Sequence, residues 1–508
     1  MATKKSDNTT TKAKTQASKS VTKTKTARIP KITVKEKKKI IYLGTEAAPF
    51  IATGGLADVL GSLPKAIANS GNYDVSVILP LYGNISADYK SNFKFVTSFN
   101  VSVGWRSQYA GVFLYEYQGI KYYFIDNEYY FKRDGNIYGF YDDGERFAFF
   151  SRACLDLIAR LDIYPDVLHC NDWQTAASIV YLKGMYFGDE KFRRIKSIFT
   201  IHNIEYQGVF SMETFGDLFG FSESLKSFVE FDGNVNLMKA AIEMSDIVNT
   251  VSPTYAEEIK NPYFAHGLHG IIVKNSHKIY GILNGIDVDY YNPETDKYLF
   301  KNYSKDDLSG KKVCKKELQK LLGLPEKPDT PIIAVISRLV SHKGLDLIKT
   351  TIESLLTSDV QVVILGKGET AYESFFTDIS KAYSGKCATI IAYNQDLSRK
   401  IYSGADIFLM PSKMEPCGLS QMIASRYGTV PVVRETGGLN DSIKAYTGET
   451  GNGFTFKDYN AHDMLYTINY AVRTYKDKGV WMDVLQKVFN MDFSWKNQAG
   501  EYEKLYNM

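Results

Sequence analysis

The sequence predicts an α/β fold made of two doubly wound nucleotide-fold domains behind a disordered N-terminal tail. The order strand, glycine-containing loop, helix and strand occurs twice, about 290 residues apart. The chain of 508 residues is 44% hydrophobic and contains 36 Tyr and 29 Phe, which suffices for two or three ordinary cores. The first 38 residues, in contrast, contain no aromatic side chain. For the rest of the chain, coiled-coil, collagen-like and disordered proteins are excluded.

The N-terminal tail, residues 1–38, is distinguished by its charge. Residues 1–39 hold 13 of the 61 basic residues but only 2 of the 57 acidic ones, which gives +11 there and −7 in the remainder. The total of +4 therefore does not indicate a nucleic-acid-binding body. We expect a solvated, disordered extension, because the tail has too little apolar surface to offset the entropy of ordering. Weak binding to polyanions and an organelle transit peptide are the alternatives; a single Arg among 12 Lys disfavours the second.

The first βαβ unit begins the predicted N-terminal domain. Residues 39–43 are a short apolar run typical of a buried strand, and a loop with Gly54-Gly55 follows. From residue 56 apolar side chains recur at helical spacing until Ser70-Gly71, where the glycine ends the helix. Residues 75–79 form the next predicted strand. The unit implies parallel pairing with a right-handed crossover.

The second half repeats this order. Residues 331–336 and 360–365 are predicted strands around a helix at 345–356. Three more strands are predicted at 389–392, 406–410 and 430–433. A strand at 279–283 and a polar, Lys-rich segment at 290–330, with a helix near its end at 313–322, place the boundary between the halves near residue 285. The predicted parts are the tail at 1–38, an N-terminal domain at 39–285, a second domain at 286–485 and a C-terminal helical segment at 486–508.

Composition also bears on the cellular setting. No apolar run approaches the ~18 residues of a membrane-spanning helix, and the N-terminus lacks the apolar core of a secretory signal. The five cysteines are widely spaced without a CxxC pair, so the pattern favours neither a disulfide framework nor a zinc site. We expect a cytoplasmic rather than a plastid location, no membrane or nucleic-acid partner, and no metal or other cofactor.

Three loops that follow predicted strands contain candidate binding residues, because ligands of open α/β sheets bind beyond the carboxyl ends of the strands. In ATGGLAD, Thr53, Gly54 and Gly55 allow close approach of a ligand to the backbone and Asp58 follows, although such a turn often serves only chain reversal. In SRLVSHKG, the planar guanidinium of Arg338 and the mobile ammonium of Lys343 are suited to hold a diphosphate together. The alternative is that both are ordinary surface cations. In EPCGLS, the carboxylate of Glu415 is well placed to accept hydrogen bonds from sugar hydroxyls. The alternative is that it only complements the dipole of the helix that follows.

Two further strings carry aromatic, amide and imidazole groups. The first, HCNDWQ, contains His169, Asn171, Asp172 and Trp173; the second, TIHNIEYQG, contains His202, Asn203 and Tyr206. Rings that stack on sugar faces, next to groups that pair with hydroxyls, are typical of carbohydrate sites. A single histidine in such a place is usually a satisfied core residue, but two such clusters in one domain favour binding.

These strings resemble the bacterial glycogen synthases and plant starch synthases. ATGGLADV, HCNDWQT, TIHNIEYQG, VSPTYAEEI, ILNGID, SRLVSHKGLDL, MPSKMEPCGLSQM, TGGLNDS and DFSW occur in the family's order, and the similarity covers residues 39–508. The resemblance implies a B-type glycosyltransferase fold, with two nucleotide-fold domains facing across a cleft and a C-terminal helix that crosses back to the first. It implies that residues 39–285 are the acceptor-side, catalytic starch synthase domain and that residues 286–485 bind the nucleotide sugar. It also implies retaining transfer of glucose from ADP-glucose to the non-reducing 4-hydroxyl of an α-1,4-glucan, so these two molecules are the expected partners.

The resemblance also implies roles for individual residues. Arg338 and Lys343 would stabilise the departing diphosphate, Glu415 would lie at the donor glucose, and Tyr393 would stack on the adenine. Together with Asn171 the first three form the expected catalytic set. The expected nucleotide-sugar residues are Thr53, Gly54, Gly55, Asp58, Asn284, Tyr393, Cys417, Gly418, Leu419 and Ser420. The expected acceptor-side residues are Asp142, Asp143, His169, Asp172, Trp173, His202, Asn203 and Tyr206.

Two positions depart from wider patterns. The family motif usually reads KTGGL, whose lysine reaches the donor, whereas this chain has Ala52. Loss of one charged contact to a phosphate costs about 1.5–3 kcal/mol, roughly ten- to a hundredfold in rate or donor affinity, so we expect a weakened rather than a dead enzyme. Ile423 stands where the wider B-type fold has the second acid of Glu-x7-Glu, as expected for starch synthases.

Two other functions remain open at this point. One is a glucosyltransferase that uses UDP-glucose or another acceptor, since Tyr393 would stack on either base. The other is an activity-impaired glucan-binding protein, which Ala52 and the cationic tail favour.

Overall fold

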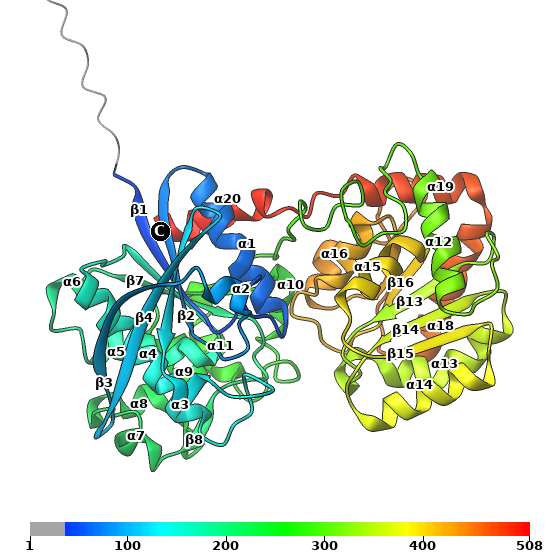
Figure 1. The fold of residues 1–508 in the computed structure, drawn as a ribbon. Helices are drawn as coiled ribbons and strands as arrows, with labels where there is room; N and C mark the ends of the chain where they lie inside the picture. The colour runs from blue at the N-terminus through cyan, green and yellow to red at the C-terminus, as the bar shows by residue number, and fades with distance from the viewer. Residues whose placement is uncertain (1–35) are drawn as a thin grey trace, which may run out of the picture. The chain divides into compact units, whose positions relative to one another are not determined.

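The computed structural model describes residues 36–508. The predicted tail lies outside the described residues except for its last three, of which Lys38 begins the first strand. The described residues form an α/β fold with two large sheets, as the sequence predicts. Figure 1 shows these two sheets with helices packed around them. Lys37–Met508 group as one compact unit, so the domain boundaries predicted at 285 and 485 stay predictions.

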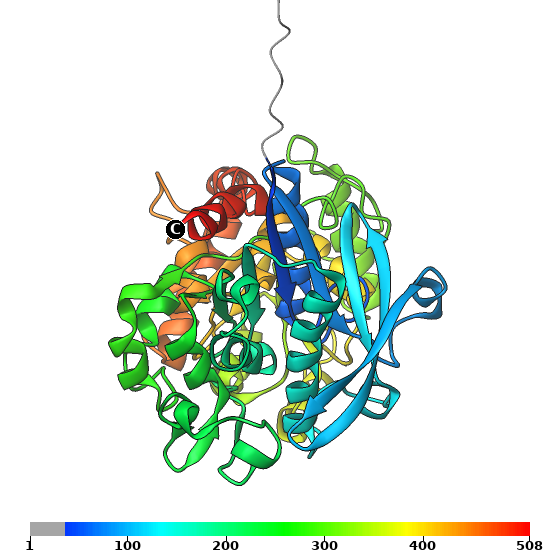
Figure 2. The same ribbon diagram turned by 90° about the vertical axis from the view of Figure 1, so that its left-hand side faces the viewer.

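A nine-stranded mixed sheet occupies the N-terminal region, residues 36–285. Its order is β12-β11-β7-β6-β1-β2-β5-β4-β3, parallel from β12 to β5 and antiparallel at the β5-β4-β3 edge. In Figure 2 the antiparallel strands, blue to cyan, lie at that edge. The strands are β1 (Lys38–Leu43), β2 (Tyr73–Pro80), β3 (Lys94–Val103), β4 (Arg106–Tyr117), β5 (Ile120–Asp126), β6 (Val167–Asn171), β7 (Lys196–Ile201), β11 (Ile247–Thr250) and β12 (Ile279–Gly281), and a small antiparallel sheet adds β8 (Val209–Ser211), β9 (Glu230–Phe231) and β10 (Asn234–Asn236).

The first helix of this region shows why the periodicity prediction succeeded. Leu56, Val59, Leu60, Leu63 and Ile67 are all buried and lie on one face of α1, which continues through an internal proline. The helices are α1 (Gly55–Asn69), α2 (Ala87–Lys90), α3 (Glu128–Phe131), α4 (Asp143–Leu161), α5 (Trp173–Gly184), α6 (Glu190–Arg193), α7 (Thr214–Asp217), α8 (Lys226–Val229), α9 (Leu237–Met244), α10 (Pro253–Glu258) and α11 (His269–Lys274), with 3₁₀ turns η1 (Glu223–Leu225) and η2 (Ser276–Lys278).

A six-stranded parallel sheet occupies the C-terminal region, residues 286–508. Its order is β15-β14-β13-β16-β17-β18, and five of its strands coincide with predicted ones. The strands are β13 (Ile332–Ile336), β14 (Gln361–Gly366), β15 (Cys387–Ile391), β16 (Ile407–Met410), β17 (Val430–Arg434) and β18 (Phe454–Phe456). The helices are α12 (Ser309–Leu321), α13 (Leu345–Thr357), α14 (Thr370–Ala382), α15 (Gln395–Gly404), α16 (Ser420–Arg426), α17 (Gly437–Ser442), α18 (Ala461–Lys476), α19 (Lys478–Phe489) and α20 (Trp495–Asn507), with the 3₁₀ turn η3 (Ser341–Lys343).

The C-terminal helix α20 returns to the first sheet, as the resemblance implied. In Figure 1 it lies beside α1 and β1. The buried phenol of Tyr506 hydrogen-bonds Tyr42 Oη of β1 at 2.6 Å and His169 Nδ1 of β6 at 3.1 Å. Lys38 Nζ donates to the Tyr506 carbonyl at 2.5 Å. Helix α20 thus completes the packing around β1.

Register brings the predicted motifs to two sheet edges. Parallel β1, β6 and β7 end together at Leu43, Asn171 and Ile201, and parallel β13 and β16 end at Ile336 and Met410. The loops that follow these ends contain the candidate residues. Within residues 36–508, every helix is either too short or too polar to cross a bilayer.

Candidate functional site

An ion pair joins the loops that follow β13 and β16. Lys343 Nζ lies 2.7 Å from Glu415 Oε2, and Ser412 Oγ donates to the same oxygen at 2.8 Å. The two side chains are only 15% and 8% exposed, so solvent screens the pair weakly. The structure therefore brings together a cation and a carboxylate that lie 72 residues apart in the sequence.

The loop that contains this cation is held tightly against its neighbour. Gly344 has a φ of +73°, and a Cβ there would lie 2.1 Å from the Pro411 carbonyl oxygen, so only glycine fits. Arg338, at the start of the same loop, is exposed, while the adjacent Leu339 is buried. The guanidinium is thus free to meet a ligand at the carboxyl edge of the sheet.

Two glycines of α17, Gly437 and Gly438, pack against the backbone of Glu415. At Gly437, which has a φ of +44°, a Cβ would lie 2.0 Å from the Glu415 carbonyl oxygen. The Gly438 N–H donates to that same oxygen at 3.1 Å. Burial raises the pKa of the Cys417 thiol to about 12, although a hydrogen bond from the Asn284 backbone partly opposes the rise. Cys417 is therefore a neutral packing residue, and the loop presents its backbone rather than a thiolate.

The glycine loop of the N-terminal region is organised by a carboxylate that the sequence analysis missed. Glu46 Oε2 accepts hydrogen bonds from the N–H groups of Thr53 and Gly54, and Glu46 Oε1 accepts one from Tyr138 Oη at 2.7 Å. The Glu46 residue is only 3% exposed. No motif spacing identifies it; an acid directly after a buried strand is the only signal. Ala52, beside this loop, is exposed.

The glycine loop lies next to the loop of the C-terminal region. The nearest atom to a Cβ built on Gly55 is Leu419 Cδ1, at 3.7 Å. Burial, with the nearby charges of Glu46 and Asp287, raises the pKa of Asp58 to about 6. The first and third motifs therefore meet at Gly55 and Leu419, and the carboxylate of Asp58 is repelled by those of Glu46 and Asp287.

Further hydrogen bonds fix the two regions to each other around α10 and α17. Ser252 Oγ donates to the Pro416 carbonyl at 2.6 Å. Thr254 gives its N–H and its hydroxyl to the two Asp441 oxygens, at 2.8 and 2.7 Å. The Asn284 side-chain oxygen is buried and accepts no hydrogen bond from residues 36–508. The strings VSPTYAEEI and TGGLNDS thus join the two regions, a function that the sequence analysis did not assign to them.

His169 and Asn171 lie inside the N-terminal region. Each residue is 1% exposed. The imidazole hydrogen-bonds Tyr506 and Thr200, and Asn171 donates to the Leu43 carbonyl at 3.0 Å while accepting from His202 Nε2 at 3.0 Å. Burial, reinforced by the neighbouring His202, lowers the pKa of His169 to about 3. In this structure both side chains hydrogen-bond other groups of the protein and are buried from solvent. Their predicted roles, catalysis for Asn171 and acceptor binding for His169, stay predictions.

Asp172 and His202 are partly exposed, in contrast to the buried His169 and Asn171. Asp172 adopts a φ of +57°, and its Oδ1 accepts the His202 N–H at 2.8 Å. Burial raises the pKa of Asp172 to about 7 and lowers that of His202 to about 3. Asn203 accepts the N–H of Glu205 at 3.0 Å. Near neutral pH this edge therefore holds a neutral imidazole beside a carboxyl group whose pKa burial has raised to about 7.

The other predicted acceptor-side residues differ in accessibility. Asp142 makes a two-pronged pair with Arg133, which lowers its pKa in spite of burial, and Asp143 pairs with Arg146 at 2.5 Å. Both carboxylates are therefore engaged internally. The two aromatic residues of this set also differ: Trp173 packs edge-on against Phe147, whereas Tyr206 is 48% exposed. Tyr393, predicted to stack on the adenine of the donor, is 74% exposed. Their predicted roles, like those of the other site residues, stay predictions.

Among residues 36–508 there is no group of three or more His, Cys, Asp or Glu side chains placed to hold an ion. The expectation that no metal is required stays a prediction.

Comparison with known proteins defines the class. Residues 39–274 match the family described as "Starch synthase catalytic domain", and residues 319–479 match "Glycosyl transferases group 1". The catalytic domain of starch synthase IV from Arabidopsis thaliana, solved bound to ADP and acarbose, superposes with a TM-score of 0.87 at 35% identity, over 93% of this chain and 99% of that one. A sucrose-phosphate synthase from Thermosynechococcus elongatus, at 15% identity and a TM-score of 0.57 over 93% of this chain and 98% of that one, shares the fold. This protein is a glycosyltransferase of the B-type fold.

Close relatives narrow the class to a family. A glycogen synthase of Clostridium novyi (strain NT) is 48% identical over 474 residues, which cover 92% of this chain and 98% of that protein. A glycogen synthase of Anoxybacillus flavithermus is 46% identical over 473 residues, with coverage of 92% and 97%. The chain belongs to the glycogen and starch synthase family.

Proposed function

We propose that this protein elongates an α-1,4-glucan by transferring glucose from ADP-glucose to the non-reducing 4-hydroxyl with retention of configuration. The names of the relatives, glycogen synthases at 46–48% identity, support the reaction. The ADP bound to the similar starch synthase IV supports the donor. The observation that carries the proposal is the Lys343–Glu415 pair beside exposed Arg338, at the edge where an α/β sheet binds nucleotides.

The reaction proposed is a front-face displacement. The bond from the glucose C1 to the diphosphate oxygen breaks ahead of attack, the acceptor 4-oxygen bonds to C1 on the same face, and its proton passes to the departing phosphate oxygen. Arg338 and Lys343 would neutralise the charge that develops on the diphosphate, without a metal. Glu415 holds the Lys343 ammonium in place and would accept hydrogen bonds from donor hydroxyls. Asp142 and Asp143, already paired with arginines, are poorly suited to act as nucleophiles.

The N-terminal region would supply the acceptor side. The loop fixed by Glu46 presents the backbone of Thr53 and Gly54 near Leu419, while Asp172 and His202 line the adjacent sheet edge. Exposed Tyr206 offers a ring face for a sugar. A cytoplasmic location stays a prediction.

A radiolabel assay tests the proposal. Purified protein is incubated with glycogen and either ADP-[14C]glucose or UDP-[14C]glucose, and labelled polymer is precipitated and counted. We expect incorporation mainly from the ADP donor. Incorporation mainly from UDP-glucose would replace the donor assignment, and a labelled product that does not precipitate would indicate a small acceptor.

A second candidate is a glucan-binding protein with impaired activity, which exposed Ala52 favours because the usual motif lysine is missing there. The same assay with Ala52→Lys separates the two. Activity that appears only after this substitution would support the impaired protein and contradict the proposal for the natural chain.

A further inference from the structure

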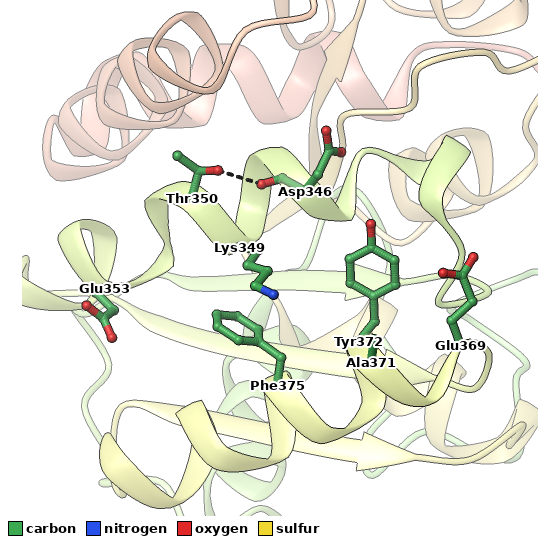
Figure 3. Close-up of a pocket in the computed structure, with 8 residues that line it drawn as sticks. All are labelled: Asp346, Lys349, Thr350, Glu353, Glu369, Ala371, Tyr372 and Phe375. Carbon is green, nitrogen blue, oxygen red and sulfur yellow. Dashed lines mark hydrogen bonds between the residues drawn. The ribbon is translucent and has the colours of Figure 1, made fainter.

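Two adjoining hollows form a groove, here named the aromatic groove; the larger lies on the C-terminal region, and Tyr263 and His266 of the N-terminal region also line the smaller. The larger, of about 680 Å³, lies between α13 and α14 and is shown in Figure 3. The smaller, of about 380 Å³, adjoins it and shares Asp346 and Tyr372 with it. None of the residues that line either hollow was singled out as a site residue by the sequence. The remaining residues that carry the argument are Tyr263, Lys349, Glu369, Phe375, Lys413 and Tyr459.

Aromatic rings lie along the groove at intervals. Tyr372 and Phe375 come from α14, Tyr459 precedes α18, and Tyr263, which is 58% exposed, comes from the loop before α11. In Figure 3 the Tyr372 hydroxyl points toward the α13 side of the hollow, where Asp346 lies. Half-buried tyrosines present one fixed ring face and one polar tip, which is the combination that stacks on a sugar and also hydrogen-bonds it.

The polar groups between these rings are nearly balanced in charge. Asp346 accepts a hydrogen bond from Tyr459 Oη at 2.5 Å, and Glu353 and Glu369 lie at the two ends of the larger hollow, Asp346 being on the Glu369 side in Figure 3. Lys349 Nζ lies 4.8 Å from the centre of the Phe375 ring, and Lys413 Nζ lies 5.6 Å from that of Tyr263. Carboxylates next to ammonium groups disfavour a polyanion, and charged groups at both ends disfavour an apolar peptide. A neutral polyhydroxyl chain fits this mixture, because its hydroxyls both donate and accept.

The groove also adjoins the reaction loops. Its smaller hollow is lined by His342 and Met414, the residues directly before Lys343 and directly before Glu415. The Lys413 N–H donates to the His342 carbonyl at 2.9 Å, so the two loops are tied together at the floor of the hollow. A chain held in the groove would therefore lie beside the loops that we propose for donor binding.

We propose that the aromatic groove binds α-glucan chains as an auxiliary site, which retains a branched polymer near the reaction loops between successive transfers. This inference rests on the proposed function, since the glucan is the acceptor named there. It assigns stacking to Tyr372 and Tyr459 and hydroxyl recognition to Asp346 and Glu369. Short acceptors gain little from such a site, whereas polymers bind at two places at once.

Two substitutions test the auxiliary site in different ways. Tyr372→Ala removes a ring, and Ala371→Arg fills the larger hollow from an exposed position without removing a contact. Phe187→Ala, at a residue that is 51% exposed and lies between α5 and α6, is the matched aromatic control. Native gels cast with glycogen measure polymer affinity, the radiolabel assay with maltotriose measures turnover on a short acceptor, and melting temperatures verify folding.

We expect both groove variants to raise the Kd for glycogen about fivefold to tenfold, the range expected for loss of one stacked ring. Turnover on maltotriose should stay within about twofold of the unmodified protein, as should all values for the control. Unchanged glycogen affinity in Ala371→Arg would overturn the auxiliary site while leaving the proposed function standing. An unmodified protein that neither binds glycogen nor elongates maltotriose would overturn both.

Discussion

The two sheet edges that meet at the candidate site use polar residues in opposite ways. In the C-terminal region Arg338 is exposed and Lys343 is held by its ion pair with Glu415, so two cations lie in one loop at the edge of the sheet. In the N-terminal region the most conspicuous polar residues, His169 and Asn171, are buried and fully engaged in hydrogen bonds. One edge thus offers charge to a ligand, and the other uses neutral polar groups to hold its own backbone. Substitutions should separate accordingly into losses of turnover and losses of stability.

The largest expected effect is on turnover, at the C-terminal edge. Arg338→Ala and Lys343→Ala should each lower kcat about a hundred- to a thousandfold, the usual range for losing one group that stabilises transition-state charge. The exposed arginine should leave the melting temperature unchanged, whereas Lys343→Ala leaves Glu415 buried without its partner and should lower it. Steady-state kinetics, glycogen binding and thermal melts verify this, with Lys476→Ala as the exposed control. Normal turnover in both variants would remove these residues from the mechanism.

The next effect is on stability at acid pH, at the N-terminal edge. His169 has a folded pKa of about 3 and an ordinary value near 6.5, so below pH 6.5 the unfolded chain binds a proton that the folded chain refuses. The free energy of unfolding contributed by His169 is therefore complete above pH 6.5 and falls by about 1.4 kcal/mol per pH unit below it, or roughly 2 kcal/mol at pH 5.

Denaturant unfolding at pH 7.5 and pH 5 measures this contribution. His169→Gln should be less stable at pH 7.5, because the bonds to Tyr506 and Thr200 change, yet it should lose less stability on acidification. Exposed His462 supplies the control, and His462→Gln should keep the original slope. A slope in His169→Gln equal to that of the unmodified protein would contradict a buried, neutral imidazole.

A smaller effect is expected at Glu46, which positions the glycine loop. Glu46→Gln should lower kcat/KM about ten- to thirtyfold, because hydrogen bonds to a charged acceptor are worth about 1.5–3 kcal/mol and the loop backbone would loosen. The loss should appear mainly as a raised KM for the donor, since Glu46 acts through the loop. A melting temperature that collapses along with activity would show instead that Glu46 serves only the fold.

The smallest effect is expected when a cation is added to the glycine loop of the N-terminal region, where the family motif has a lysine and this chain has Ala52. Ala52→Lys should raise kcat/KM for the donor about tenfold, the lower end of the range for a charged phosphate contact. The exposed position should accept the longer side chain without loss of stability. Ala52→Gln, similar in size but neutral, separates charge from bulk; an equal gain in both variants would contradict an electrostatic role.

Local signals predicted most of the fold. The burial of Leu56, Leu63 and Ile67 on one face of α1 follows directly from their spacing, and the apolar runs around β13 and β14 fixed those strands within two residues. The antiparallel edge of β3 and β4 was not predicted, because it resides in a hairpin whose partner strands are selected by tertiary packing.

The candidate site was predictable in part, and for a physical reason. Arg338, Lys343 and Glu415 lie in loops directly after buried strands, so parallel pairing alone brings them together. The roles of His169 and Glu46 in the structure depend on partners 337 and 92 residues away, Tyr506 and Tyr138, which no periodicity connects. The sequence shows which polar side chains follow a strand. Whether such a side chain can reach a ligand depends on its burial, which distant parts of the chain determine.

The return of α20 to the first strand has a consequence for biosynthesis. Tyr506 of α20 hydrogen-bonds Tyr42 of β1, and Lys38 donates to the Tyr506 carbonyl. A nascent chain emerges from its amino end, so the polar interior around β1 stays incomplete until Tyr506, 464 residues after Tyr42, has been synthesised. A chain released before Tyr506 should lack the hydrogen-bond partner of Tyr42 and one of the two partners of His169, and such a truncated product should be unstable.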